Sequence, residues 1–151
     1  MSVTLSVLRE KSEKHRFERL EVDDSRTTIP DVDARALAAA LKRELAGEVR
    51  FDKGARALYS TDGSNYRQVP IGVVIPRHIE DVEATMHLAR KFGAPILSRG
   101  GGTSLAGQCC NVAVVMDFSK YMHRVLHVDA AAKRARVEPG CVLDDLRHAA
   151  M

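Results

Sequence analysis

The chain has 151 residues, of which 45% are hydrophobic and 28% charged, and its formal net charge is +3 at pH 7. This length allows one domain with its own core, and so small a charge, with bases interleaved among acids, argues against a nucleic-acid-binding protein. Because no apolar run approaches a transmembrane helix and the N-terminus lacks the apolar segment of a signal peptide, we expect a cytoplasmic protein.

The N-terminal third is predicted to be an arm followed by a helix. Residues 1–30 are charged and mixed, which is typical of a partly ordered segment. A helix then begins near Pro30, with Asp31 or Asp33 as its N-cap, and ends at Gly47. Its apolar residues recur every four positions, at Leu37, Leu41 and Leu45. We therefore assign residues 1–48 to an arm and helix, and the main domain to residues 49–151.

A polar loop follows a short turn and one helical turn at residues 50–59. The loop Thr61-Asp-Gly-Ser-Asn-Tyr-Arg67 gathers an acid, a hydroxyl, a phenol and a guanidinium. Loops on a rigid scaffold often carry function, so this cluster could line a site. An Asx-type turn with Tyr66 on the surface explains the same residues equally well.

The next segment is predicted to be a βαβ unit. Residues 71–75 are nearly all β-branched, which indicates a buried strand that Pro76 ends. A helix over residues 78–92, closed by Gly93, precedes a parallel strand at residues 95–98, with a right-handed crossover. The inner face of this helix is predicted to consist of Ile79, Val82, Met86 and Phe92.

Three successive glycines follow that strand, in the segment Arg99-Gly-Gly-Gly-Thr-Ser-Leu-Ala-Gly107-Gln108. Glycine brings backbone N–H groups close to a ligand, and successive N–H groups aimed into one concavity suit phosphate. Thr103 and Ser104 add hydroxyl donors, and Arg99 adds a permanent cation. Because α/β proteins bind ligands at the carboxyl ends of parallel strands, we favour a diphosphate cradle over a glycine turn without a ligand.

Two familiar phosphate loops do not fit this segment. The dinucleotide fingerprint requires a third glycine where the chain has Leu105. Gly102 and Gly107 have the spacing of a P-loop, but Gln108 stands where the phosphate-binding lysine is required. A nucleotide bound here would therefore be held by another fold.

The last part of the chain changes to antiparallel structure. A third buried strand at residues 112–117 precedes two short strands at residues 124–129 and 135–138, which are typical of a hairpin. A final helix reaches Met151 without a glycine cap or a trailing proline. We therefore expect the sequence to be a fragment of a longer protein.

The cysteines do not indicate a metal site. Cys109, Cys110 and Cys141 contain no Cys-x-x-Cys pair. Their odd number and the adjacent pair are typical of free thiols in a reducing compartment. Neither their spacing nor their number supports zinc or an iron–sulfur cluster, and we predict no metal ligands.

Five segments in order resemble the FAD-linked oxidases, which have a vanillyl-alcohol oxidase/PCMH-type FAD-binding domain. They are most similar to FAD-dependent D-2-hydroxyacid dehydrogenases acting on D-lactate, glycolate or 2-hydroxyglutarate, some of which are fused to an iron–sulfur module. The resemblance implies an α+β fold, with an N-terminal βαβ subdomain and the start of a second, antiparallel subdomain. The matching segments are Val73-Val-Ile-Pro76, Glu80-Asp-Val82, Arg99 to Gln108, Val115-Met-Asp-Phe118 and Val137-Glu-Pro-Gly140 with Leu143. The segment Tyr59-Ser-Thr-Asp-Gly-Ser-Asn-Tyr-Arg67 also resembles the one that precedes this domain in the family, so the resemblance covers roughly residues 50–151.

The resemblance also implies the cofactor and its site. The FAD pyrophosphate would lie on the backbone N–H groups of residues 100–104, and Pro76 would close the first strand near the adenine. FAD would be bound non-covalently, because members with covalent flavin often carry a histidine where this chain has Thr103. The implied cofactor-binding residues are Pro76, Arg99, Gly100, Gly101, Gly102, Thr103, Ser104, Gly107 and Gln108.

The implied function is the FAD-binding part of an oxidoreductase that converts a D-2-hydroxy acid to a 2-oxo acid. Catalytic residues of the family follow the point where this chain stops, so none is assigned. Two alternatives stay open: an inactive flavin-domain fragment that only binds or assembles, self-associating through exposed strand edges, and a nucleotide-binding module without redox chemistry. The family leaves room for an iron–sulfur partner domain and for peripheral association with the inner membrane through a quinone acceptor.

Overall fold

The computed structural model describes residues 5–7, 18–20 and 31–151. Strand β1 (Leu5–Val7) pairs antiparallel with β2 (Glu18–Leu20) in a sheet of their own. The sequence had predicted no strand here, because both segments are short and their composition is mixed. The rest of the predicted arm lies outside the described residues.

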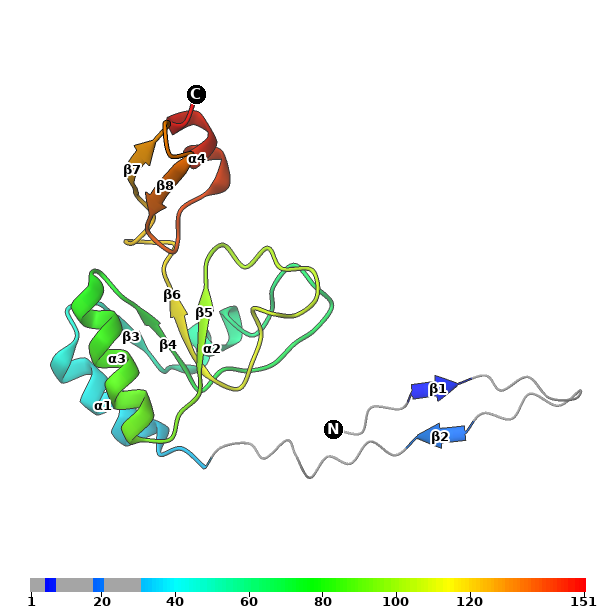
Figure 1. Cartoon of the computed structure of the whole chain (residues 1–151). Coiled ribbons are helices and arrows are strands. Elements are labelled where there is room, and N and C mark those ends of the chain that lie inside the picture. The colour runs from blue at the N-terminus through cyan, green and yellow to red at the C-terminus, as the bar shows by residue number, and fades with distance from the viewer. Residues whose placement is uncertain (1–4, 8–17, 21–30) are drawn as a thin grey trace, which may run out of the picture.

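A four-stranded mixed sheet forms the centre of the molecule (Figure 1). Its order is β3 (Glu48–Arg50), β4 (Gly72–Ile75), β6 (Val114–Asp117) and β5 (Ile96–Arg99). Strands β4 and β5 both run parallel to β6, whereas β3 is antiparallel to β4. Every residue of β4 and β6 is buried, which explains their continuous apolar sequences.

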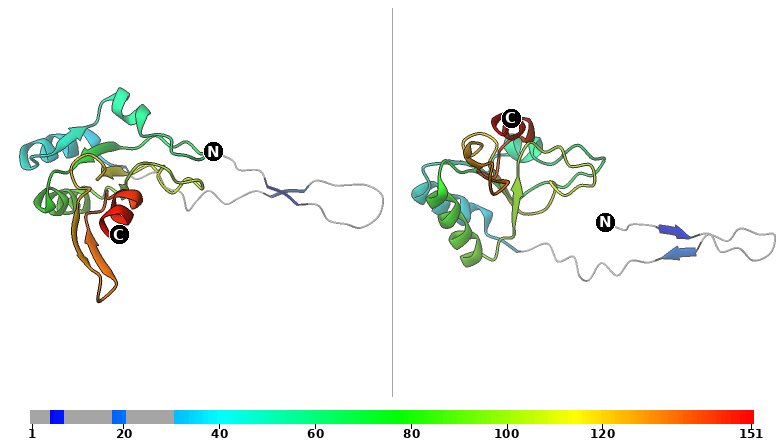
Figure 2. Two further views of the ribbon diagram at one scale, coloured as in Figure 1. Left: turned by 90° about the horizontal axis from the view of Figure 1, so that it is seen from above. Right: turned by 45° about the horizontal axis from the view of Figure 1, so that its top comes forward.

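Helices α1 (Ala34–Glu44) and α3 (Ile79–Lys91) cover one face of this sheet (Figures 1 and 2). The predicted N-cap of α1 is confirmed, since the Asp33 carboxylate accepts a hydrogen bond from the Ala36 N–H at 2.9 Å. The other face carries a smaller apolar cluster, packed against Tyr59, Leu97 and Tyr121. The core between sheet and helices includes Leu37, Leu41, Val74, Leu88, Val114 and Met116.

The predicted end of α1 is wrong. The helix ends at Glu44, because Leu45 already has an extended backbone. Gly47 serves another purpose, since a Cβ there would overlap the carbonyl oxygen of Ile75 at the end of β4. Glycine at this position therefore allows close contact between two chain segments instead of capping a helix.

The predicted inner face of α3 is wrong in part. Ile79 and Met86 are 55% and 52% exposed, although Val82 packs against the core as predicted. Asp81 is buried because its carboxylate accepts hydrogen bonds from the Ala46 and Arg77 N–H groups, each at 2.9 Å. These polar contacts determine which side of the helix faces the core, and the periodicity of apolar residues does not reveal them. The residues that α3 buries are Asp81, Thr85, Leu88 and Ala89.

Two smaller units complete the chain. Helix α2 (Lys53–Leu58) follows β3 and is capped by the Asp52 carboxylate. The predicted hairpin is confirmed as β7 (Val125–Asp129) and β8 (Arg134–Val137), followed by α4 (Leu143–Ala149), and this unit stands beyond the end of β6 (Figure 1). The buried Glu138 carboxylate closes the base of this hairpin by accepting hydrogen bonds from the Arg124 N–H and guanidinium, each at 2.7 Å. Within the described ranges, no helix is both long enough and apolar enough to span a membrane.

Candidate functional site

The glycine loop, residues 100–108, begins where β5 ends at Arg99. The carboxyl ends of β4, β5 and β6 share this edge of the sheet, since the three strands are parallel. Gly102 and Gly107 have φ values of +70° and +77°, which glycine adopts more readily than any other residue. The structure therefore places the loop at the position that the sequence predicted, directly after a parallel strand.

Gly100 and Gly101 have no packing reason to be glycine. A Cβ at Gly100 would meet no described atom within 4 Å, and one at Gly101 would meet only the Thr103 Cγ2, at 3.7 Å. Neither residue is among those with positive φ. A Cβ at Gly102, in contrast, would overlap the Arg99 guanidinium. The first two glycines thus leave a bare backbone that faces open space, as the close approach of a ligand requires.

The main-chain N–H groups of residues 100–104 donate to no acceptor within the described part of the chain. Because the loop is exposed or half-exposed, water satisfies these N–H groups, and a ligand with acceptor oxygens can replace that water. Successive N–H groups in a loop of this kind form a concavity that attracts anions. The residues present therefore fit a pyrophosphate group, which carries several acceptor oxygens and negative charge.

The Arg99 side chain is used to hold the loop together. Its Nη1 donates to the carbonyl oxygens of Thr61, at 2.9 Å, and Cys109, at 3.1 Å. Its guanidinium also lies over the Tyr59 ring, 5.2 Å from the centroid. These contacts join the start of the glycine loop to its end, so the role of Arg99 as a direct ligand of the cofactor stays a prediction.

The other predicted residues lie in two places, either on the glycine loop or directly after β4. The Ser104 hydroxyl donates to the Gln108 side-chain oxygen, which also accepts from the Ala106 N–H at 3.2 Å, so both side chains shape the loop. Thr103 is exposed on the loop. Pro76 is buried directly after β4, which β6 separates from β5 and its loop. The structure thus brings residues 99–108 together and places Pro76 farther along the same edge.

The polar loop at residues 61–67 lies beside the glycine loop (Figure 1). The Gly63 N–H donates to the Gly102 carbonyl at 2.9 Å, and the Cys109 N–H donates to Asp62 Oδ2 at 3.1 Å. Asp62 Oδ1 accepts from the Ser64 N–H at 2.9 Å, which is the predicted Asx turn. Tyr66 is 59% exposed. The predicted Asx turn with Tyr66 on the surface is therefore confirmed, and the interpretation that the loop lines a site stays a prediction.

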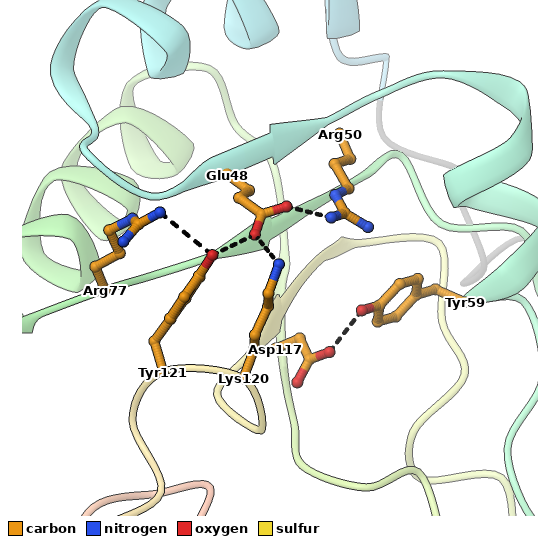
Figure 3. A network of polar contacts seen from close by, with 7 residues as sticks. All are labelled: Glu48, Arg50, Tyr59, Arg77, Asp117, Lys120 and Tyr121. Carbon is orange, nitrogen blue, oxygen red and sulfur yellow. Dashed lines mark hydrogen bonds and ion pairs between the residues drawn. The ribbon is translucent and has the colours of Figure 1, made fainter.

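A second polar cluster lies at the same edge, on the sheet face away from α1 and α3 (Figure 3). Glu48 accepts hydrogen bonds from Lys120, from Arg50 and from the Tyr121 hydroxyl, the last at 2.7 Å. These bonds, chiefly that from Lys120, lower the pKa of Glu48 to about 2. Sequence reasoning missed this cluster, because Lys120 and Tyr121 are 72 and 73 positions from Glu48 and no local pattern joins them.

Tyr59 stands between this cluster and the glycine loop. Its hydroxyl donates to Asp117 Oδ2 at 2.6 Å, and Asp117 lies opposite Arg99 in the pairing of β6 with β5 (Figure 3). Burial first, and then this hydrogen bond, raise the pKa of Tyr59 to about 12. The phenol therefore stays protonated and continues to donate to Asp117 at neutral pH.

The Glu48 cluster makes the free energy of unfolding depend on pH in the acid range. The folded-state pKa of about 2 lies below the ordinary value of 4.5, so the stabilisation is complete above pH 4.5 and is lost as the pH falls towards 2. We expect the urea midpoint of the wild type to fall more steeply between pH 4.5 and pH 3 than that of Glu48→Gln. Glu44→Gln, at the exposed end of α1, is the control and should keep the wild-type slope. Parallel profiles for the wild type and Glu48→Gln would contradict the assignment.

The described residues contain no group of three or more His, Cys, Asp or Glu side chains that could hold a metal ion. The three cysteines are free, with Cys110 buried and Cys109 and Cys141 partly exposed. Burial is the main cause of a raised pKa for the Cys110 thiol, which keeps it in its neutral form.

Comparison with known proteins points to a flavin domain. A family profile described as an FAD binding domain matches residues 70–151. D-2-hydroxyglutarate dehydrogenase from Pantoea ananatis is 35% identical over 103 residues, which are 66% of this chain and 10% of that protein. Glycolate oxidase subunit GlcD from Escherichia coli is 31% identical over 116 residues, covering 74% of this chain and 23% of that protein. The chain therefore spans only 10% and 23% of the lengths of these two relatives.

Solved structures share the fold. The 4-ethylphenol oxidase from Gulosibacter chungangensis superposes with a TM-score of 0.60 and 26% sequence identity. The superposition covers 81% of this chain and 26% of the oxidase. The predicted α+β architecture of a PCMH-type FAD-binding domain is thus confirmed by the fold as well as by the family profile.

Proposed function

Because the chain belongs to the FAD binding domain family, we propose that its glycine loop holds the pyrophosphate of FAD on the N–H groups of residues 100–104. The observation that carries this proposal is the bare backbone at Gly100 and Gly101, in front of N–H groups without an acceptor among the described residues. Charge-assisted hydrogen bonds to phosphate oxygens are stronger than those between neutral groups. Each N–H group of the loop that meets a phosphate oxygen would therefore contribute more to affinity than a hydrogen bond between neutral groups.

The remaining predicted residues would complete the site. Thr103 presents its exposed hydroxyl beside the phosphate-binding N–H groups and, as it is not a histidine, leaves FAD bound non-covalently. Gly107 and Gln108 continue along the cofactor, and Pro76 contacts the adenine side. When bound, FAD supplies the acceptor for a hydride from the substrate. The chain's own contribution is to bind and orient this group.

The activity of the whole protein is proposed to be oxidation of a D-2-hydroxy acid to a 2-oxo acid. The names of its relatives support this class of substrate, since one is a D-2-hydroxyglutarate dehydrogenase and another a glycolate oxidase subunit. We assign no catalytic residue to this chain. We further propose that the whole protein works with an iron–sulfur partner domain. We also propose that it is cytoplasmic and lies peripheral to the inner membrane.

The second candidate function is a binding or assembly module without turnover. It is favoured by strand β8, all four residues of which are exposed, and by the exposed Val142 and Leu143, since such surfaces promote association. An assay of the purified chain with FAD, a redox dye and D-2-hydroxyglutarate or glycolate, together with its size-exclusion profile, tests the module. Dye reduction above that with FAD alone would overturn the module and support the enzyme. A chain that stays monomeric would also count against the module, which requires association.

The test of FAD binding is a titration that follows the change of flavin fluorescence. We expect saturable binding in which ADP-ribose, which retains the pyrophosphate, competes with FAD. Riboflavin, which lacks phosphate and carries the same fluorophore, is titrated separately and should bind more weakly than FAD. Binding of riboflavin as tight as that of FAD, with no competition by ADP-ribose, would show that the loop does not hold the pyrophosphate.

A further inference from the structure

We propose that Asp62 is a positioning residue that holds the glycine loop in its ligand-binding shape before FAD arrives. This inference rests on the proposed function, in which residues 100–104 bind the pyrophosphate. Asp62 precedes the segment matched by the FAD-binding domain profile, which begins at residue 70. Its effect would act through the loop and not through contact with the cofactor.

Three hydrogen bonds connect the segment around Asp62 to the glycine loop. Arg99, at the start of the loop, donates to the Thr61 carbonyl, and Gly63 donates to the Gly102 carbonyl, both at 2.9 Å. At the far end of the loop, the Cys109 N–H donates to Asp62 Oδ2 at 3.1 Å. Both ends and the middle of the loop are therefore fixed to the same short segment.

The two oxygens of the Asp62 carboxylate have different partners. Oδ1 accepts from the N–H and the hydroxyl of Ser64, within its own turn, whereas Oδ2 accepts from Cys109 across the gap between the loops. The bonds from Ser64, the side-chain bond first, lower the pKa of Asp62, so that it is ionised at neutral pH. The local turn thus orients the carboxylate, and the Oδ2 atom, held in this orientation, fixes the position of the Cys109 N–H at the end of the glycine loop.

Holding the loop matters because of its glycines. Glycine loses more backbone freedom on ordering than any other residue, and three occur in succession at residues 100–102. If the loop were free, FAD binding would have to order it, and affinity would fall accordingly. A loop fixed at both ends presents its N–H groups in a single arrangement before the cofactor binds.

The experiment compares Asp62→Asn with Ser64→Ala in FAD titrations of the full chain. The asparagine oxygen can serve either Ser64 or Cys109 but not both, so we expect the Kd of Asp62→Asn to rise by about three- to tenfold, as for loss of one hydrogen bond. Ser64→Ala removes only the hydroxyl bond to Oδ1, because the N–H of residue 64 still donates to Oδ1 and orients the carboxylate, and the bond from Cys109 to Oδ2 remains. Its Kd should stay within about twofold of the wild type.

Hydrogen exchange without FAD distinguishes positioning from general stability. In Asp62→Asn, exchange should become faster at the amides of Gly63, Cys109 and Cys110, which are hydrogen-bonded within or between the two loops, and remain unchanged in β4 and β6. A wild-type Kd in Asp62→Asn, while Gly101→Val still weakens FAD binding, would overturn the role of Asp62 and leave the proposed function intact. Absence of FAD binding by the wild type would overturn both. If Asp62→Asn does not fold, a wild-type Cys109 amide that exchanges as fast as an unprotected amide would overturn the inference, and a protected one would support it.

Discussion

Replacing Gly101 by valine is expected to weaken FAD binding by about 100-fold or more and to leave the thermal midpoint of the chain unchanged. The valine side chain would project into the open space in front of the glycine loop, where its Cβ meets only Thr103 Cγ2 at 3.7 Å. It would keep the pyrophosphate away from at least two N–H groups, and a hydrogen bond to a charged group is worth about 1.5–3 kcal/mol. A flavin fluorescence titration and a thermal melt of the same sample measure both effects.

Gly102→Val is the matched control for this prediction. This variant introduces the same valine side chain at the next residue of the loop. Gly102, however, has a positive φ, and a Cβ there would overlap the Arg99 guanidinium. We therefore expect this variant to lower the thermal midpoint as well as FAD affinity. Unchanged FAD affinity in a folded Gly101→Val chain would contradict the placement of the pyrophosphate.

Replacing Asp81 by alanine is expected to lower the free energy of unfolding by about 3 kcal/mol, the largest loss of stability predicted for a polar residue here. Its carboxylate is 2% exposed and accepts hydrogen bonds from the N–H groups of Ala46 and Arg77. These bonds join the turn before β3 to the turn between β4 and α3. Truncation leaves both N–H groups without their charged acceptor, and urea unfolding of the two proteins measures the cost.

Glu80→Ala is the control, because Glu80 is the neighbouring acid and its side chain is 73% exposed. Its only ion pair among the described residues is with His78, and an exposed pair contributes at most about 1 kcal/mol. We expect its urea midpoint to stay close to that of the wild type. Equal effects of the two substitutions would show that Asp81 contributes through helix charge and not through its buried hydrogen bonds.

The sequence predicted those features that local chemistry determines. Residues 71–75 and 112–117 are continuous apolar runs, and the structure buries β4 and β6 completely. The Asp33 N-cap and the hairpin of β7 and β8 follow from short patterns and are confirmed. The position of the glycine loop follows from the strand before it. The division of the chain at residue 48 and the individual cofactor ligands stay predictions.

The features that the sequence did not predict depend on partners far away in the chain. Burial of Asp81 on α3 depends on an N–H group 35 positions earlier. Counting apolar residues therefore placed Ile79 and Met86 wrongly on the inner face, although it placed Val82 and Phe92 there correctly. Thr85 is buried on the same face because its hydroxyl donates to the Asp81 carbonyl at 2.6 Å. The Glu48 cluster and the link from Asp62 to Cys109 likewise join residues that only the folded sheet brings together.

The most direct test of the account is a titration of the ¹⁵N-labelled chain with FAD, followed through its amide signals. We predict that the signals of residues 100–104 shift to lower field in a saturable way, because their N–H groups form hydrogen bonds to phosphate oxygens. ADP-ribose should reproduce these shifts, and signals from α1 should not move. Saturable binding of FAD that leaves the signals of residues 100–104 in place, or no binding by the folded chain, would contradict the central claim.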